Sequence, residues 1–511
     1  MNFLAGEDRF QLTFGSLEEK ITNDNPVRFL DAFVDKLELG KLGFKVNTLK
    51  TEGRPPFDSK VFMKIYLYGY LNGLRSSRKL EKECVRNIEL QWLTKNLQPN
   101  YHSIADFRKL NPKGLKSVFK LFVLFLKEAD LIGGKMVAVD GTKVRASNSK
   151  KNNYSEKKIA RHLKYIEEET NKYLKQLDEN DRQEEPLKIN DIQKKLERLN
   201  SNKIKYELLD QTLKESEETQ ISTTDKDSRL LQGQGLEFNV GYNVQASVDD
   251  KFKLVVGTQT INETDRNALS AASIETKENL GEEKLTVLAD KGYHTGEEIL
   301  KCKEEKISTI VSKREISNSK GKGTTPDYLV DKFIYNKEKD NYICPAGNVL
   351  TTDGKWKEYK KEGKLYKFKS YKTDACGMCP VKHLCTSAKR REIQRKDYTE
   401  AVEENDKRYQ ENPSLYKKRQ ELNEHVFGTI KRQWGYNYTN LRGKEKVDGE
   451  FNLIMTVYNI KRVIGILGIN QMLEGMDKWV PEYAKMLKNA FNRAQISFHE
   501  GIFLNKIQLV S

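Results

Sequence analysis

The chain has 511 residues, which predicts about three domains and a conventional buried core. Lys and Arg total 90 against 74 Asp and Glu, and the net charge of +16 favours a polyanionic partner such as nucleic acid, although a merely lysine-rich protein would show the same excess. No apolar run approaches the roughly 20 residues of a membrane-spanning helix, and MNFLAGEDRF lacks the pattern of a secretory signal. We therefore expect a cytoplasmic protein with no membrane partner.

Residues 1–115 are predicted to form a helical domain. Apolar residues recur with helical period from 60 to 74, GLRSS (73–77) interrupts them, and Ser76 or Ser77 can cap a second helix. The second helix is basic, with Arg78, Lys79, Lys82 and Arg86. Helix, short turn and basic helix are typical of a helix-turn-helix reader of DNA, but a plain helical bundle gives the same pattern.

Two strands of the predicted catalytic domain (130–314) each carry a carboxylate. The apolar run 136–139 is followed by Asp140, which we expect to end its strand, and Gly141 is expected to break it. The run 285–289 leads in the same way to Asp290 before Lys-Gly. Open α/β sheets place their chemistry at such strand ends. The two carboxylates could meet over a shared cation, although each alone is an ordinary cap or turn residue.

A highly charged segment, 150–214, interrupts this domain. Apolar residues keep a spacing of three or four on both sides of Pro186, which predicts two long helices folded back as a hairpin. A solvated spacer is the simpler interpretation, and a DNA or dimer contact is the other.

The β pattern returns in EFNVGYNVQASVD and KLVVGTQTI, with a hairpin around 249–251. A helix over 265–280, the strand before Asp290, a helix around 297–302 and a strand at 307–313 follow. This order predicts an α/β fold with an RNase H-like mixed sheet and flanking helices, if 150–214 is an insertion.

Residues 315–395 form a second insertion, which is rich in cysteine. The four cysteines are Cys344, Cys376, Cys379 and Cys385. Cys-x2-Cys presents two thiolates from one turn, and four thiolates suit tetrahedral zinc. We expect a structural Zn²⁺ that holds a region too poor in apolar residues to fold alone, with His383 as a possible substitute ligand. Free or redox-active thiols are the alternative.

Residues 396–470 are predicted to be helical. Glu424 offers a third carboxylate, and hard oxygen ligands of this kind suit Mg²⁺. An apolar helix over 447–467 is expected to pack beneath the sheet, whereas the tail, 471–511, gives no clear pattern.

Taken together, several motifs resemble the DDE-type transposases of bacterial insertion sequences, within the RNase H-like integrase superfamily. They are VAVDGTKVRAS around Asp140, VGYNVQASVD, VLADKGYH around Asp290, EHVFGTIKR from Glu424, and LRGKEKVDGEFNLIMTVYNIKRV. The leading helical stretch RPPFDSKVFMKIYLYGYLNGLRSSRKLEKECVRN and the cysteine insertion also look like their counterparts in those proteins.

The resemblance implies that Asp140, Asp290 and Glu424 are catalytic and hold two Mg²⁺ or Mn²⁺ ions. It implies binding of the terminal inverted repeats of an element, cleavage at its ends and joining to target DNA. The partner would be double-stranded DNA, bound by a homodimer and associated with the nucleoid.

Four residues near the third carboxylate are candidate DNA contacts: Arg419, Lys431, Arg432 and Trp434. Lys431 lies seven residues after Glu424, two helical turns on, so we expect it on the same face, where it could hold a phosphate. Tyr436 and Tyr438, like Trp434, could stack on bases, although core packing is the commoner role of aromatic residues. Tyr293 and His294 are expected to be structural or DNA-positioning.

The chain departs from the related pattern Tyr-x2-Arg-x3-Glu-x6-Lys. Tyr416 and Arg419 are correctly spaced, but the position four after Arg419 is Asn423, and Glu424 follows one residue late. Five positions place Arg419 about 140° from Glu424 on an unbroken helix. Glu421 is the rival ligand. We favour Glu424 because Lys431 keeps the expected spacing, so that Gln420 and Lys417 take the places of Arg and Tyr unless a helical bulge restores the register.

Two other functions fit the same residues. The chain could be a transposase-derived protein that binds DNA without cutting it, although three clustered carboxylates without metal would only repel one another. It could also be an RNase H-like hydrolytic nuclease that never joins strands.

Overall fold

The computed structural model describes residues 10–11, 14–45, 55–181, 186–216, 218–233, 237–313, 324–361 and 364–481. Most of the predicted tail, from 482 onward, lies outside the described residues. Contacts divide the chain into two units. The first contains residues 1–265, 275–282 and 420–511, and the second contains 266–274 and 283–419.

The first unit begins with six helices. They are α1 (Pro26–Asp35), α2 (Ser59–Leu71), α3 (Ser77–Arg86), α4 (Ile88–Thr94), α5 (Tyr101–Leu110) and α6 (Pro112–Glu128), after the 3₁₀ turn η1 (Glu18–Lys20). Ser76 precedes α3 as its N-cap, which confirms the predicted helix, turn and helix. Helix α3 buries Leu80 and Cys84, and its four basic side chains are exposed.

An antiparallel sheet follows in the same unit. Its strands are β1 (Met136–Arg145), β4 (Arg229–Gln232), β5 (Phe238–Asp249) and β6 (Val255–Ile261). The long β5 pairs with β1, β4 and β6. The predicted hairpin after Asp249 is confirmed, and the Asp249 carboxylate accepts a hydrogen bond from the Lys251 amide in this turn (3.0 Å).

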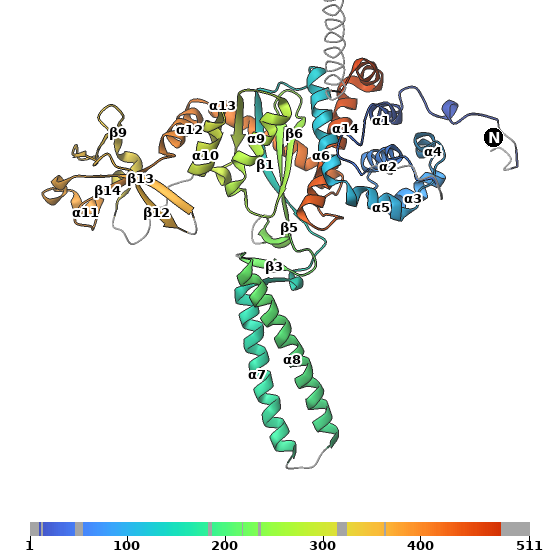
Figure 1. Ribbon diagram of the computed structural model, residues 1–511. Coiled ribbons are helices and arrows are strands. Elements are labelled where there is room, and N and C mark those ends of the chain that lie inside the picture. The colour runs from blue at the N-terminus through green and yellow to red at the C-terminus, as the bar shows by residue number, and fades with distance from the viewer. Residues whose placement is uncertain are drawn as a thin grey trace, which may run out of the picture. The chain divides into compact units, whose positions relative to one another are not determined.

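Two long helices occupy the charged segment, as predicted. Helices α7 (Glu156–Asp181) and α8 (Pro186–Glu215) lie side by side (Figure 1). The short strands β2 (Asn153–Ser155) and β3 (Gln220–Ser222) pair at the base of the hairpin, after the turn η2 (Lys150–Asn152). There Tyr154, Ile159 and Leu213 form a small core.

The first unit closes with three consecutive helical segments. Helix α13 (Pro413–Phe427) enters it at Gln420, the π-helical turn η8 (Gly428–Gln433) follows, and α14 (Lys444–Lys478) comes last. The left-handed φ of 76° at Gly468 interrupts α14, so the apolar helix stops at Leu467 as predicted. Its packing against the edge strand β6 is also as expected. The side-chain amide of Asn459 accepts a hydrogen bond from the Val255 N–H (2.8 Å) and donates one to the Val255 carbonyl (2.7 Å).

Helix α14 is the one helix among the described residues that is long and apolar enough, by length and composition, to cross a membrane. Its most apolar window is 61% buried inside the protein, as the core helix of a folded domain would be.

The second unit contains a parallel pair, β7 (Leu285–Ala289) and β8 (Ile307–Val311), joined through the turn η4 (Lys291–Tyr293) and α10 (Gly296–Glu304). Helix α12 (Thr399–Glu411) lies along β8, where the Asn405 side chain bonds both backbone groups of Val311 (2.9 and 3.0 Å). The turn η3 (Asp265–Asn267) and helix α9 (Leu269–Leu280) contain residues of both units. Antiparallel and parallel strands with flanking helices agree with the predicted mixed α/β class.

The cysteine-rich insertion has its own small sheets. One consists of β9 (Ile334–Asn336), β10 (Asn341–Ile343) and β11 (Val349–Leu350), and the other of β12 (Lys357–Lys361), β13 (Lys364–Lys372) and β14 (Glu392–Lys396). Its helical turns are η5 (Pro326–Tyr328), η6 (Val330–Lys332), η7 (Asp374–Gly377) and α11 (Lys382–Cys385).

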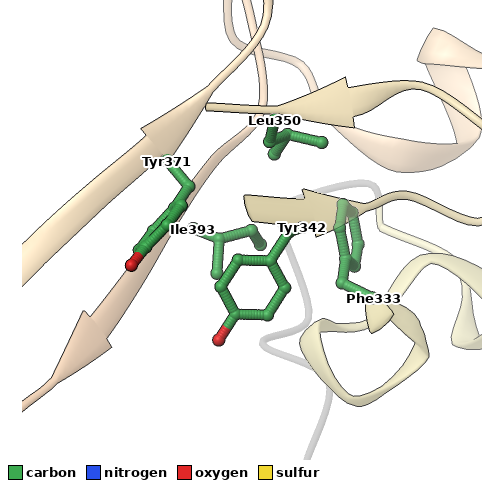
Figure 2. Packing of buried hydrophobic residues seen from close by; sticks show 5 residues of the cluster. All are labelled: Phe333, Tyr342, Leu350, Tyr371 and Ile393. Carbon is green, nitrogen blue, oxygen red and sulfur yellow. The ribbon is translucent and has the colours of Figure 1, made fainter. Parts of the chain in front are cut away.

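The insertion has a small core, in a region that was expected to be too poor in apolar residues to fold alone. The buried side chains of this core lie close together, as Figure 2 shows; they are Phe333, Tyr342, Leu350, Tyr371 and Ile393. Aromatic residues among the many lysines supply this core, because one tyrosine ring buries as much apolar surface as several small residues.

Candidate active site

Asp140 lies inside β1 and not at its end. The strand continues to Arg145, with Asp140 opposite Ala246 and Gly141 opposite Gln245 of β5. The prediction that Asp140 ends the strand and Gly141 breaks it is therefore wrong, because the buried residues Thr142 and Val144 continue the alternation. The Asp140 side chain is half-buried, and its Oδ1 accepts a hydrogen bond from the Gly141 amide (2.8 Å).

A buried polar cluster lies against Gly141. The Asp265 carboxylate accepts hydrogen bonds from Asn243 (2.8 Å), Gln245 (3.0 Å) and Lys143 (2.7 Å). A Cβ atom at position 141 would clash with this carboxylate, so the close approach requires glycine. Side chains alternate between the two faces of a strand, so Gly141 and Lys143 lie on one face of β1 and Asp140 on the other. The polar cluster is therefore on the face opposite Asp140.

The ionisation of Asp265 contributes to stability. Burial alone would raise the pKa of this carboxyl, but the Lys143 ammonium and the hydrogen bonds from Asn243, Lys143 and Gln245 outweigh burial and hold the pKa below its ordinary value. A group with a lowered folded-state pKa stabilises the fold above its unfolded pKa of about 4, and that stabilisation is lost as the pH falls through the folded pKa.

We expect Asp265→Asn to lower the free energy of unfolding at neutral pH by about 1–3 kcal/mol, because the new amide presents N–H groups to three donors. Urea unfolding of both proteins at neutral pH, and again near pH 3, measures the difference. It should shrink as the pH falls through the folded-state pKa, because the wild-type carboxyl then becomes neutral as well. A difference independent of pH would contradict the ionised cluster.

Lys431 contacts the strand of Asp140. It lies in the π-helical turn, and its Nζ donates to Thr142 Oγ1 and to the Lys143 carbonyl (both 3.0 Å). The pKa of Lys431 is lowered by burial and by the positive charges of Lys143 and Arg432. Because i→i+5 hydrogen bonds widen this turn, the expectation of two regular α-helical turns between Glu424 and Lys431 is wrong.

Helix α13 contains both rival glutamates, Glu421 and Glu424, and they have different partners. Residues 413–427 form uninterrupted α-helix, so no bulge restores the register between Arg419 and Glu424. Glu424 is exposed and accepts a hydrogen bond from Gln420 (2.8 Å). Gln420 is the residue expected to stand where the related pattern has Arg, four positions before Glu. Glu421 instead pairs with Lys253 (2.5 Å), in the turn between β5 and β6. Asn423 is buried, and its side-chain amide has no hydrogen-bond partner among the described residues.

Asp290 belongs to the second unit. It directly follows β7, as predicted, and its Oδ1 caps η4 by accepting from the Lys291 amide (2.7 Å). The pKa of Tyr416 is raised by burial and further by the Asp290 carboxylate, while Arg419 opposes this rise. The Arg419 guanidinium lies 5.6 Å from the centre of the Tyr416 ring. The two residues that match the related pattern are therefore neighbours, and Tyr416 lies close enough to Asp290 to be influenced by its charge.

The residues just past Asp290 are held by the fold. Tyr293 is 1% exposed. The Nε2 atom of His294 lies 3.1 Å from the Asp406 carboxylate, which also pairs with Lys313 (3.3 Å). These contacts favour the structural role that was one of the two roles expected for this pair.

The candidate DNA contacts differ in exposure. Arg432 is exposed, whereas Trp434 is half-buried, with its ring 5.6 Å from that of Tyr436 and the Lys461 ammonium 5.4 Å from its centre. Tyr436 is buried, and its hydroxyl donates to the Tyr70 carbonyl (2.9 Å). Core packing thus excludes Tyr436 from stacking on a base.

All four expected zinc ligands line one cavity. Cys344, Cys376, Cys379 and Cys385 share it with Phe333 and Leu350 of the small core. Burial raises the pKa of the Cys385 thiol, which Arg391 opposes. Within the described part of the chain, however, no group of three or more His, Cys, Asp or Glu side chains is arranged to hold a metal ion. The thiols are neighbours without forming a ligand set.

The three expected carboxylates are divided between the units. Asp140 and Glu424 belong to the first and Asp290 to the second. Asp265 and the fully buried Glu450 were not predicted. Lys143, Asn243 and Gln245 alternate with other residues along two paired strands, and this alternation could have indicated a polar face. Nothing in the sequence, however, pairs that face with Asp265.

Two comparisons with known families bear on these residues. The family described as "Transposase domain (DUF772)" matches residues 15–110, which contain the helices α1 to α5. The family described as "Transposase DDE domain" matches residues 343–464, which contain the four clustered cysteines and Glu424, but neither Asp140 nor Asp290. No curated protein and no solved structure matches the chain. Both matches are to transposase domains, and together they support a DDE-type transposase of an insertion-sequence family.

Proposed function

We propose that the protein binds the terminal inverted repeats of an insertion sequence, cleaves DNA strands at the element ends and transfers them to target DNA. The contact that carries this proposal is the one between Lys431 and β1, because it holds the turn after Glu424 against the strand of Asp140. The catalytic core would have an RNase H-like fold, to which the mixed strands and flanking helices conform.

Asp140, Asp290 and Glu424 would form the catalytic centre. Three carboxylates are the hard oxygen donors that Mg²⁺ or Mn²⁺ prefers. When bound, two such ions would activate the attacking water or 3′ hydroxyl and stabilise the leaving oxygen. Lys431 carries three N–H donors, of which Thr142 and Lys143 take two, so the third could reach a phosphate oxygen.

Double-stranded DNA would be the partner, both as element ends and as target. The exposed basic face of α3 suits a DNA groove, and Arg419, Arg432 and Trp434 would add contacts near the catalytic centre. We further propose a homodimer on DNA, so that two element ends are processed together, in the cytoplasm at the nucleoid.

Labelled element ends incubated with target plasmid and Mg²⁺ test this function. Joined products support strand transfer. Hydrolysed ends without joining would instead indicate an RNase H-like nuclease, and bound but intact DNA would indicate a catalytically inactive DNA-binding protein.

We also propose that the cysteine cavity takes up a structural Zn²⁺. The lining of one cavity by all four thiols supports it, since thiolates are the preferred ligands of structural zinc. Zinc would hold this region together, so its removal by a chelator should unfold the chain locally between about 340 and 390.

We expect one zinc per chain, lost in Cys376→Ser and Cys379→Ser. The controls Cys84→Ser and Cys302→Ser change cysteines that are buried in other parts of the protein, and both should retain the metal. Elemental analysis of purified reduced protein measures the ratio. Wild-type protein without zinc would contradict the site.

A further inference from the structure

One aromatic ring on the segment after η8 is exposed. Tyr438 has 44% of its surface accessible, whereas Tyr436 has only 2%. An exposed tyrosine is not unusual by itself. What distinguishes Tyr438 is how its backbone and its ring are held.

The backbone of Tyr438 is fixed on both sides. The Arg145 amide, at the end of β1, donates to the Asn437 carbonyl (3.0 Å), and the Thr439 amide donates back to the Arg145 carbonyl (2.8 Å). The Arg75 guanidinium donates to the Tyr438 carbonyl (2.8 Å). This short segment therefore behaves as an added strand at the end of β1 and cannot swing freely.

A buried cation lies beneath the ring. The Arg75 Cζ atom is 4.9 Å from the ring centre of Tyr438 and 4.7 Å from that of Tyr436. Glu450, which is fully buried, holds the guanidinium at 2.7 Å. Nε and Nη1 of Arg75 have no hydrogen-bond partner among the described residues, so the N–H groups of these two nitrogens are left to the neighbouring rings. The stack of rings and guanidinium reaches the surface at Tyr438.

A preorganised aromatic ring backed by a cation is suited to stacking. Proteins bind unpaired bases on such rings, because every base has a π-face and the ring loses little entropy when it is already held. The guanidinium draws π density toward its own side, which makes the exposed face more attractive to an electron-rich purine.

We propose that Tyr438, mounted on Arg75, is a stacking platform for an unpaired nucleobase of the bound DNA. The inference rests on the proposed function and adds to it a site for single-stranded DNA. Tyr438 lies beside Arg145, five residues beyond Asp140 along β1, or roughly 17 Å in an extended strand. The stacked base would therefore lie several nucleotide steps from Asp140.

The test compares two probes at one salt concentration: a blunt duplex and the same duplex with a short single-stranded overhang containing 2-aminopurine. Wild-type protein should bind the overhang probe more tightly and quench its fluorescence. Tyr438→Ala should lose about ten-fold in affinity for the overhang, ~1.4 kcal/mol, and lose the quenching, while its affinity for the blunt duplex stays the same. Tyr438→Trp should restore both signals.

Tyr165→Ala is the matched control, since Tyr165 on α7 is 57% exposed and is not one of the rings that stack on Arg75. It should behave as wild type with both probes. Wild-type behaviour of Tyr438→Ala, or an equal loss on both probes, would overturn the stacking site and leave the proposed function intact. Failure of the wild-type protein to bind either probe would overturn both.

Discussion

Asp140→Asn and Asp290→Asn are each expected to reduce DNA cleavage by about 10²-fold or more, while DNA affinity stays close to wild type. Each change removes a negative ligand oxygen and no cationic phosphate contact. Asparagine keeps an Oδ1 acceptor for the Gly141 and Lys291 amides, so the local backbone should be preserved. Cleavage of labelled element ends and a binding titration measure the two quantities.

Binding should fall steeply with salt in the wild type and in both variants, as counterion release requires. A variant that cuts at the wild-type rate would remove its aspartate from the catalytic centre.

The third carboxylate is tested by a pair of variants on one helix. Glu424→Gln should eliminate strand transfer, although glutamine can keep the hydrogen bond to Gln420. Glu421→Gln should leave most of it, because it weakens a partly exposed ion pair with Lys253, worth about 0–1 kcal/mol. The opposite result would assign the metal ligand to Glu421, almost one helical turn earlier, and would leave Glu424 without a catalytic role.

The largest expected effect on stability is that of Glu450→Gln, which should cost about 3–5 kcal/mol. Glu450 is fully buried and pairs with Arg75 (2.7 Å) and Arg108 (3.6 Å), themselves 5% and 6% exposed. Its other oxygen accepts from the amides of Asn440 (3.0 Å) and Leu441 (3.3 Å). The neutral side chain would leave two buried guanidinium groups without a counter-charge.

Hydrogen exchange of amides in α2, α5 and α14 measures the loss, because it reports local opening without requiring a single unfolding transition. Glu445→Gln is the control on the same helix, α14. Glu445 is exposed, and its surface ion pair with Lys113 is long (3.9 Å) and adds little stability. Equal effects of the two variants would show that the buried network adds no stability.

Local patterns predicted most elements but not their ends. The alternation in β5 and the apolar spacing in α7 and α8 are properties of consecutive residues, so they could be seen in the sequence. The end of β1 could not be predicted, because glycine usually interrupts a strand. Here Gly141 lies within the strand, and the carboxylate of Asp265, more than a hundred residues away, packs against it. The π-helical turn after Glu424 was likewise missed, since regular helical spacing was assumed up to Lys431.

The sequence by itself determined the resemblance to transposases, the mixed α/β class, the position of Asp290 after its strand and the clustering of cysteines, since all of these depend on residue types at short spacing. Only the tertiary structure decided that Lys431 bonds to β1, that Glu421 pairs with Lys253 and that Tyr436 is buried while Tyr438 is exposed. These contacts join residues that are distant in the chain. Hydrogen-bond partners, burial and a lowered pKa are set by neighbours in space, which no local pattern specifies.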